Sequence, residues 1–579
     1  MRYRKLWFFA ILVMLIIAFS TSCKKPDNDG VRDEKLSVEK ESEIEEETKK
    51  DEQKDFVLEK EGKKKKTSNI PHIILKEIIE ECNDDEIGSS LYRIRNNMLQ
   101  LKDEGKDFEA LNNAFKEYNK EVSEKMVYTK ESMDGLAESE KSNRLSGFGE
   151  NTRLYETDTY IMRADNVVVS ILNYTEYDYT GGNPGYIRSS ANFDTLSGEN
   201  IKFTDVVKDD EKFFEMVDKR AKEDYEESNI TKPSQYAKEI KEDGYKDLVW
   251  TISPMGVTVY FDTEILGKNT DGPQVITISF EEAKDIFEPK YIYKDKDYVF
   301  PVVAGNMNLH FDIDGDGKQE NVSVDPVYNQ NAETLDIYET GLMVYGGKFG
   351  EKEISGYDGR AYLVRKNDNY YMYVFIVDEI SALYSLDLKG AEAENDYDML
   401  SLSIRDNSWE QDGNIERYEA LKETFTDTKS FMVETMGYLL GTVVAEKECC
   451  VGDEGKPEIS SERGKVSSEI ALYTLKDIEC MVVDEKGNIK SEDVVVPSDS
   501  YILPIYTDNE KFVDVITIDE KYLDVFGEEG DRYFVLNKNI FSDYEGYCYR
   551  IMVETDEEGF NKVNGEDLEK IFEGIMYVG

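Results

Sequence analysis

The sequence predicts an α+β protein, in which a domain of helices and an antiparallel sheet precedes several β-rich modules. Two observations favour this fold class. Apolar residues recur at the spacing of one helix face between Phe108 and Met126. After the polar segment 130–150, the chain from Thr157 to Phe287 is rich in β-branched and aromatic residues, with one further helical pattern inside it. This order of helices, strands, helix and strands is typical of an α+β domain, which we place at residues 69–295.

Local patterns predict the elements of this domain. The segment 69–81 is apolar enough for a strand or a short helix. A helix is expected where four apolar residues recur at helical spacing (Leu91, Ile94, Met98, Leu101). A second helix is predicted within 205–227, with Asp209 or Asp210 as its N-cap. Its buried stripe is Phe213, Phe214 and Val217. The expected strands lie within 157–182, 185–203, 248–263 and 273–287.

The N-terminus has the layout of a bacterial secretion signal. Arg2, Arg4 and Lys5 precede an apolar run, Leu6–Phe19, and small residues then lead to Cys23. The run is shorter than the ~20 residues that a membrane-spanning helix needs. We therefore expect a lipoprotein signal peptide over 1–22 and a lipid on Cys23, which would hold the protein on the outer face of the cell membrane. An ordinary cleaved signal peptide and a short uncleaved anchor are the alternatives.

Charge restricts the possible partners. Residues 23–68 combine dense mixed charge with very few large apolar residues, which predicts a disordered tether. The whole chain has 70 basic and 123 acidic residues, a net charge of −53. Nucleic acids need basic side chains against their phosphates, so no nucleic-acid partner is expected. The acidity favours cations and basic partners, although it also serves simply to keep a surface protein soluble.

The cysteines do not form the pattern of a disulfide-rich protein. Beyond Cys23 there are five, an odd number at scattered positions (Cys82, Cys449, Cys450, Cys480, Cys548). Cys449 and Cys450 are adjacent, and adjacent residues pair only with strain, so free thiols are expected there. A bridge between Cys480 and Cys548 stays open. No spacing is typical of a zinc site.

Several segments of the first domain resemble a known extracytoplasmic domain. They are RADNVVVSILNYTEYDYTGG, FDTLSGENIKFTDVV, WTISPMGVTVYFD and VITISFEEAKDIF. This domain is found in the ectodomain of lysozyme-sensing anti-sigma factors of the RsiV type and in front of the catalytic domain of PdaC-type peptidoglycan deacetylases. The resemblance implies a ligand-binding ectodomain, with peptidoglycan or lysozyme as a candidate partner. Many members carry a histidine in the turn after the two glycines, where this chain has Asn183–Pro184–Gly185.

A D-x-D-x-D-G motif opens the next segment. Asp312, Asp314 and Asp316 alternate before Gly317, and Glu320 follows. Alternating carboxylates on a tight loop suit a hard cation, and the Lys318 carbonyl is a further candidate ligand. The predicted site is therefore a structural Ca²⁺ loop made by Asp312, Asp314, Asp316, Lys318 and Glu320. It is not an EF-hand, because its twelfth position is Ser323. A polar turn whose aspartates cap backbone amides is the alternative.

The remaining chain is expected to be β-rich. We predict one domain over 298–450, with a helix inside 418–450, and a C-terminal module over 466–579 that ends in a small helix. The C-terminal module is similar to modules of long lipoproteins from anaerobic Gram-positive bacteria. The predicted organisation is thus a signal peptide (1–22), a tether (23–68), an α+β domain (69–295), a β-rich domain with the DxDxDG loop (298–450) and a C-terminal β-rich module (466–579).

Few residues in the chain favour catalysis. The sequence has two histidines, His72 and His310, and no nucleophile elbow, phosphate-binding loop or HExxH motif. We therefore expect a protein that is not an enzyme. Because carboxylates are abundant, a glycan hydrolase that uses two of them in the 300–450 region is an alternative. A purely structural surface scaffold is another.

A tyrosine-rich stretch around Gly181 and Gly182 is the last candidate site. Alternate residues of a strand face opposite sides, so Tyr177 and Tyr179 are expected to share one face. Together with Tyr186, they would form an aromatic platform for a sugar ring or a protein partner. The alternative is the ordinary aromatic surface of a sheet.

Overall fold

The structure is a computed structural model. It describes residues 70–577, except 85, 103–106, 146–151, 179–184, 227, 229, 306, 331–336, 347–349, 378–380, 391–392, 397–398, 468, 528–531 and 538–545. The signal peptide, Cys23 and the tether lie outside this part and stay predictions. Residues Ile70–Gly579 form one compact unit. Within the described chain, we find no helix that combines the length and the apolar character needed to cross a membrane.

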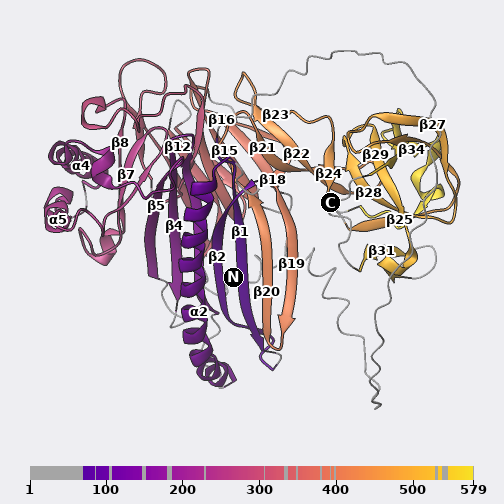
Figure 1. Ribbon diagram of the computed structural model, residues 1–579, viewed down its shortest axis with the longest axis horizontal. Helices are drawn as coiled ribbons and strands as arrows, with labels where there is room; N and C mark the ends of the chain where they lie inside the picture. The colour runs from indigo at the N-terminus through magenta and orange to yellow at the C-terminus, as the bar shows by residue number, and fades with distance from the viewer. Residues whose placement is uncertain are drawn as a thin grey trace, which may run out of the picture. The chain divides into compact units, whose positions relative to one another are not determined.

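A seven-stranded sheet forms the first part of this unit (Figure 1). Its strand order is β19-β20-β1-β2-β3-β4-β5. The strands are β1 (Ile73–Asp84), β2 (Ser89–Leu101), β3 (Arg153–Ala164), β4 (Val168–Asp178), β5 (Gly185–Asp194), β19 (Ile404–Asp412) and β20 (Ile415–Glu423). All neighbours are antiparallel except β2 and β3, which are parallel. The combination of helix and sheet, followed by further sheets, confirms the predicted α+β class.

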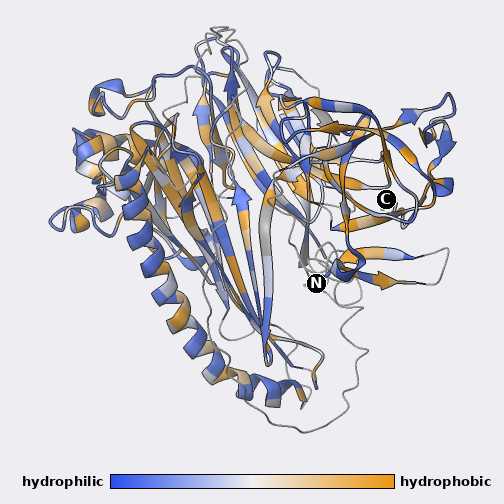
Figure 2. Cartoon of the chain, turned by 45° about the vertical axis from the view of Figure 1, so that its right-hand side comes forward, coloured by the Kyte–Doolittle hydropathy of each residue, from blue (hydrophilic) through white to orange (hydrophobic). Residues whose placement is uncertain are grey.

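The helix α2 (Glu109–Leu145) connects the two parallel strands. A parallel pair needs such a crossover, because a tight turn cannot return the chain in the same direction. Leu111 and Phe115 bury against β1, β2 and β4, while Met126 and Met133 bury beside Tyr92 of β2. Figure 2 shows hydrophobic positions recurring among hydrophilic ones along this long helix. The helix predicted from Phe108 to Met126 is therefore confirmed.

The helix predicted from Leu91 to Leu101 is wrong, because these residues form β2. Burial along β2 is close to alternating, as in a strand, but two of its buried residues are the polar Asn96 and Asn97. They interrupt the apolar alternation and leave an apparent helical spacing. The Asn97 side-chain amide donates to the Thr157 carbonyl at 2.9 Å, so burial of this polar group is compensated.

The seven-stranded sheet crosses the predicted boundary between 69–295 and 298–450. β20 pairs with β1 over nine positions, from Ile74 opposite Glu423 to Cys82 opposite Ile415. The two predicted segments therefore share one sheet. The helix expected inside 418–450 is also wrong, since this stretch forms the end of β20 and the strands β21 (Phe431–Gly437) and β22 (Val443–Val451). Strict alternation of burial in β21 and β22 is the strand signal there.

A smaller layer of helices and strands follows β5. The strands β6 (Val249–Ile252), β7 (Gly256–Phe261) and β8 (Gln274–Ser279) form a three-stranded sheet. The helices are α3 (Phe203–Val206), α4 (Asp210–Asp224) and α5 (Pro233–Ile240). Asp209 is the N-cap of α4, and its carboxylate accepts from the Lys212 amide at 3.0 Å. The predicted stripe of α4 (Phe213, Phe214, Val217) is buried in the core of this layer, as expected.

The rest of the chain is β-rich. A five-stranded sheet contains β9 (Tyr298–Val302), β14 (Asp358–Lys366), β15 (Asn369–Val377), β16 (Ala382–Asp387) and β17 (Ala393–Asp396). A four-stranded sheet contains β10 (Leu309–Phe311), β11 (Glu320–Gln330), β12 (Ile337–Gly346) and β13 (Gly350–Ser355). The large C-terminal sheet contains β18 (Met399–Leu402), β21, β22, β23 (Pro457–Ile459), β24 (Gly464–Val466), β25 (Ile470–Thr474), β26 (Ile478–Val483), β27 (Ile489–Val496), β28 (Tyr501–Thr507), β29 (Phe512–Ile518), β30 (Leu523–Phe526), β31 (Tyr533–Leu536), β32 (Cys548–Met552) and β36 (Phe572–Glu573). A last small sheet contains β33 (Glu554–Thr555), β34 (Asn561–Val563) and β35 (Glu566–Asp567).

Two sequence predictions about the C-terminal half have clear outcomes. The closing helix is only a single 3₁₀ turn, Leu568–Lys570. Cys480 and Cys548, for which a bridge stayed open, are both buried free thiols. Cys82 and Cys450 are free as well, and the Cys449 thiol donates to the Cys450 carbonyl.

Candidate functional site

The acidic loop lies in the hairpin between β10 and β11. Asp312, Asp314 and Glu320 each place one carboxylate oxygen within 4.8 Å of the other two. Asp316 does not belong to this group, because its carboxylate contacts the Lys318 ammonium at 3.3 Å. Of the five predicted ligands, the structure therefore brings three side chains together.

The backbone of the loop holds these carboxylates in place. Asp312 accepts from the amides of Gly315 and Gly317, at 2.7 and 2.8 Å. Glu320 accepts from the Ile313 amide at 2.7 Å. Gly315 and Gly317 both have a φ near +80°, a conformation that favours glycine. This is the amide-capped turn that the alternative interpretation predicts, and the same three carboxylates have the chemistry to hold a hard cation.

The tyrosine stretch is only partly described, because Tyr179, Gly181 and Gly182 lie outside the described residues. Tyr177 is opposite Gly185 in the β4–β5 ladder, whereas Tyr186 is opposite Glu176, so the two tyrosines are on opposite faces of the sheet. The Tyr177 ring lies over Gly185, where a Cβ atom would be 2.5 Å from it.

The exposed aromatic pair of this region is a different one. Tyr186 is 41% exposed and stacks on Tyr174, with ring centroids 5.5 Å apart. The Arg188 guanidinium lies 5.0 Å from the centroid of the Tyr174 ring. The prediction that Tyr177 and Tyr186 share one platform is therefore wrong. The aromatic pair that stacks in this region is Tyr174 and Tyr186.

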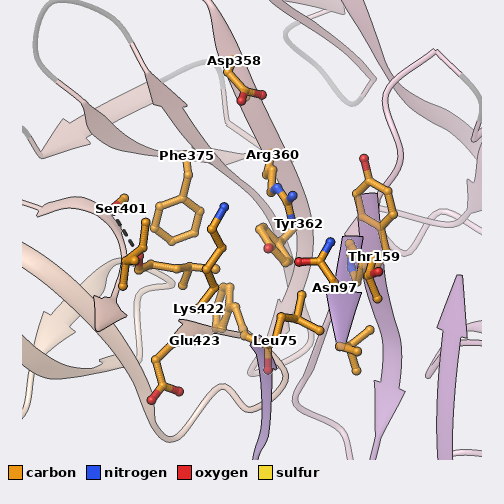
Figure 3. A pocket seen from close by; sticks show the side chains of 18 of the residues that line it. Leu75, Asn97, Thr159, Asp358, Arg360, Tyr362, Phe375, Ser401, Lys422 and Glu423 are labelled. Carbon is orange, nitrogen blue, oxygen red and sulfur yellow. Dashed lines mark hydrogen bonds between the residues drawn. The ribbon is translucent and has the colours of Figure 1, made fainter. Parts of the chain in front are cut away.

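A cavity of about 170 Å³ lies between the seven-stranded sheet and the five-stranded sheet (Figure 3). Side chains from β1, β2, β3 and β20 line one side, and side chains from β9, β14 and β15 line the other. We call this space the inter-sheet cavity. Its lining residues extend from Leu75 to Thr426, so no local sequence pattern could have revealed it.

Three cations line the inter-sheet cavity: Arg95 of β2, Arg360 of β14 and Lys422 of β20. They belong to an ion-pair network with Glu77, Asp158 and Glu156, the last of which is 3.6 Å from the Arg95 guanidinium. The Lys422 ammonium is 2.7 Å from the Glu77 carboxylate. The Asp158 carboxylate accepts from Arg95 at 2.8 Å and from Arg360 at 3.2 Å.

The network changes the acidity of its members. Burial alone would raise the pKa of Glu77, which is 2% exposed, but Lys422 and Arg95 hold that pKa below its usual value. Burial lowers the pKa of Lys422, and Glu77 only partly offsets this because Arg360 and Arg95 act in the same direction as burial. The Lys422 ammonium is thus poorly solvated, and two further cations, Arg360 and Arg95, lie near it.

Two carboxylates, Glu423 and Asp358, also belong to the lining. Burial lowers the pKa of Arg360, but Asp158 and, to a smaller degree, Asp358 raise it. Glu423 is fully buried and binds His72 and the Lys102 ammonium, the latter at 3.4 Å. Figure 3 shows its carboxylate directed away from Lys422. Asp358 is exposed at the start of β14.

Polar and apolar groups complete the cavity wall. Asn97 and Thr159 lie on the side of the seven-stranded sheet, and the Tyr160 ring lies 5.5 Å from the Arg360 guanidinium. Phe375, Ile376 and Leu402 supply apolar surface. Cations, hydrogen-bonding groups and apolar side chains converging in one concave space are typical of a small-ligand site.

Glu434 of β21 lies next to this wall. Its carboxyl group contacts the Ser401 hydroxyl at 3.3 Å, and Ser401 lines the cavity. Burial raises the pKa of Glu434 to about 7, and the nearby charge of Glu446 adds to the effect. A carboxyl group with this pKa is protonated near neutral pH and so has a property of a general acid.

His310 is one of the two histidines of the sequence. It lies on β10, directly before the loop, and its Nε2 is 2.8 Å from the Asp224 carboxylate at the end of α4. His72 instead contacts Glu423, so the two histidines contact different carboxylates.

Comparisons with known proteins give one kind of match. No family model matches the chain, and no curated protein matches it. A solved structure of a DUF3298 family member from Bacteroides fragilis NCTC 9343 is similar over 38% of this chain and 94% of its own, with 13% identity and a TM-score of 0.29. A DUF3298 family protein from Pseudomonas aeruginosa PAO1 is similar over 39% of this chain and 97% of its own, with 11% identity and a TM-score of 0.26. The solved structures that part of this chain is similar to are thus members of a family named as a domain of unknown function.

Proposed function

We propose that this protein is a lipid-anchored bacterial cell-surface protein whose ectodomain binds a ligand and does not catalyse a reaction. The observation that carries the binding function is the inter-sheet cavity, with its cations, hydrogen-bonding groups and apolar wall. The location follows from the N-terminal sequence that ends at Cys23.

The proposed ligand is an envelope glycan or a secreted protein such as lysozyme. This proposal comes from the resemblance to the RsiV-type and PdaC-type ectodomains. The net charge of −53 would steer a basic protein towards the chain, and salt would screen that attraction.

The charges of the cavity support binding over hydrolysis. A glycosidase needs two carboxyl groups on either side of the bond that it cleaves. Among the described lining residues, Glu423 is fully buried in its contacts with His72 and Lys102, and Asp358 is at the exposed start of a strand. Three of the five charged residues that line the cavity are cations.

A binding assay with the whole mature chain tests this function. The chain should be incubated with insoluble peptidoglycan and, separately, with lysozyme, at low salt and at ~1 M salt, where the Debye length is only about 3 Å. Lysozyme binding that disappears in high salt would support a sensor or decoy of this basic protein. Peptidoglycan binding that survives would support a glycan receptor. Binding to neither would contradict the proposal and favour the structural scaffold.

The membrane anchor has its own test. Expressed in a Gram-positive host, the chain should partition into the detergent phase, and a Cys23→Ser variant should move to the aqueous phase because it has no thiol to accept the lipid. Equal partitioning of the two proteins would contradict lipidation.

We also propose that the acidic loop binds Ca²⁺ in a structural role. Asp312, Asp314 and Glu320 would supply carboxylate oxygens, and the Lys318 carbonyl is a further candidate. The ion would fix the β10–β11 hairpin in a medium that contains millimolar calcium.

A glycan hydrolase is the second candidate, favoured by the raised pKa of Glu434. The carboxyl group contacts Ser401 and the Ile404 amide and is not itself part of the cavity lining. Release of muropeptides from peptidoglycan by the wild-type chain, and its loss in Glu434→Gln, would establish hydrolysis. No release by the wild-type chain would leave binding as the function.

A further inference from the structure

In the inter-sheet cavity, the cations line the space, and the carboxylates that pair with them lie behind the cavity wall. Arg95, Arg360 and Lys422 line the space, whereas Glu77 and Asp158, which pair with them, do not. Glu77 is 2% exposed, so it lies beneath the wall. A chain with a net charge of −53 thus places three cations on the wall of this cavity.

Two of these cations retain donors that a ligand would use. An ammonium has three donors and a guanidinium has five. Among the described side chains, Glu77 is the one that pairs with Lys422, and Arg360 contacts the Asp158 carboxylate and the Tyr362 hydroxyl. The side chains of Lys422 and Arg360 are 28% and 33% exposed. Figure 3 shows both charged ends directed towards the same space, with Asn97 beside them.

The size of the cavity limits what enters it. Its 170 Å³ correspond to about six water molecules at the volume of liquid water. This space takes a charged group and part of one ring, so a longer glycan would place one residue there and keep the rest outside. Phe375 lies next to Lys422 in Figure 3, so an entering ring would contact an aromatic face while its charged group meets the cations.

We propose that the inter-sheet cavity is an anion site that takes the carboxylate of a single acidic sugar residue, with Lys422 and Arg360 as the groups that bind the carboxylate. The proposal rests on the proposed binding of envelope glycan and deepens it by naming the part that is recognised, the free carboxylate of an acidic sugar residue such as a muramic acid residue without its stem peptide. A carboxylate would accept from the donors of Lys422 and Arg360 that face the cavity. In this poorly solvated space, charge-assisted hydrogen bonds to it would be strong.

A pair of sugars that differ in one carboxylate tests the proposal. N-acetylmuramic acid and N-acetylglucosamine share the same ring, and only the first has a carboxylate. Calorimetric titration of the whole mature chain should show binding of the acid, with affinity at least about 10-fold above that for the neutral sugar, because charged hydrogen bonds contribute about that much. Equal affinity for the two sugars would overturn the proposal.

Variants locate the binding to the named residues. Lys422→Gln and Arg360→Gln should each weaken binding of the acid about 10- to 100-fold. Lys422→Arg retains the charge and should restore most of the affinity. The matched control is Lys429→Gln, which makes the same change of charge at an exposed position of the adjoining loop and should leave affinity unchanged. Wild-type affinity in Lys422→Gln and Arg360→Gln would overturn the proposal. Thermal unfolding of each variant establishes that it is folded.

The binding reaction also has a proton signature. A carboxylate beside Lys422 raises the pKa of the ammonium, which is lowered in the free protein. Binding should therefore take up a proton at alkaline pH, visible as a dependence of the binding enthalpy on the buffer. Lys422→Arg should bind without this uptake, because a guanidinium stays protonated. Uptake that persists in Lys422→Arg would contradict the role of Lys422.

Failure of this inference differs from failure of the proposed function. Peptidoglycan binding that is identical in wild type and Lys422→Gln would remove the cavity as its site and leave the binding function intact. Binding of N-acetylmuramic acid without any binding of peptidoglycan or lysozyme would keep the anion site and remove the proposed function. Inorganic phosphate is the third probe. Competition by phosphate supports an anion site, and failure of both anions to bind overturns it.

Discussion

The inter-sheet cavity and the acidic loop are two charged regions of opposite sign, built in opposite ways. The loop takes its three carboxylates from nine consecutive residues, Asp312 to Glu320, and its own backbone amides already satisfy them. The cavity takes its cations from strands more than 300 residues apart, and its pairing carboxylates leave donors of Lys422 and Arg360 available. The difference teaches that a site built from consecutive residues can be recognised in the sequence, even where the amides of its own loop stabilise it. A site built from strands that are distant in the sequence cannot be recognised in this way.

The largest expected effect comes from removing the carboxylate behind the cavity. Glu77→Ala leaves Lys422 and Arg95 without this buried partner, which should lower the free energy of unfolding by about 3 to 5 kcal/mol. Urea denaturation measures this. Glu353→Ala, at an exposed position of β13, is the control and should change stability by about 0.5 kcal/mol or less. A loss below about 1 kcal/mol in Glu77→Ala would mean that the cations of the cavity do not depend on their buried carboxylate.

A smaller effect is expected from Glu434, beside the cavity. Its pKa of about 7 in the folded chain is above the usual value of 4.5, so the unfolded chain loses this proton first as pH rises. Native stability should therefore fall between about pH 4.5 and 7, and Glu434→Gln should remove that fall. The variant should be more stable than wild type by about 2 to 3 kcal/mol at pH 8. The two proteins should converge at pH 4, and a constant difference at both pH values would contradict the raised pKa.

The smallest effect concerns the acidic loop, because its backbone amides already stabilise it. Calcium at about ten times its dissociation constant should stabilise the chain by about 1.4 kcal/mol, measured as a rise in the unfolding temperature. Asp314→Asn should abolish this rise. Asp316→Asn should retain it, because Asp316 contacts Lys318 and lies outside the three-carboxylate group. If both variants lose the calcium-dependent rise in unfolding temperature, Asp316 is a calcium ligand after all. If calcium does not raise the unfolding temperature of the wild type, the loop is the amide-capped turn.

Part of the fold could be predicted because local signals were strong there. The stripe from Phe108 to Met126 and the N-cap at Asp209 predicted α2 and α4 correctly. β2 was missed because the buried Asn96 and Asn97 disguise its alternation, and these amides have partners that exist only in the folded sheet, as the contact of Asn97 with Thr157 shows. Secondary-structure propensity depends on residues that are neighbours in the sequence, whereas tertiary contacts decided the structure of β2.

The candidate sites differ in the same way, because local residues could be predicted and tertiary contacts could not. The sequence motif led to Asp312, Asp314 and Glu320, which the structure brings together, and it wrongly grouped Asp316 with them. It could not lead to Lys422 and Glu77, whose contact requires β20 to pair with β1. A buried acidic residue in an apolar strand, Glu77 in β1, was the available hint that a distant cation would be needed.

The position of β1 has a mechanical consequence. β1 is the first strand of the described chain, yet it is hydrogen-bonded on both sides, to β2 and to β20. If Cys23 carries the lipid, any force between membrane and ectodomain enters the fold at Ile73. A pull along β1 would load the hydrogen bonds of both ladders simultaneously, in shear, whereas an edge strand peeled from a sheet loses its bonds one after another. An attachment point inside the sheet would thus let the surface protein bear load without losing its first strand.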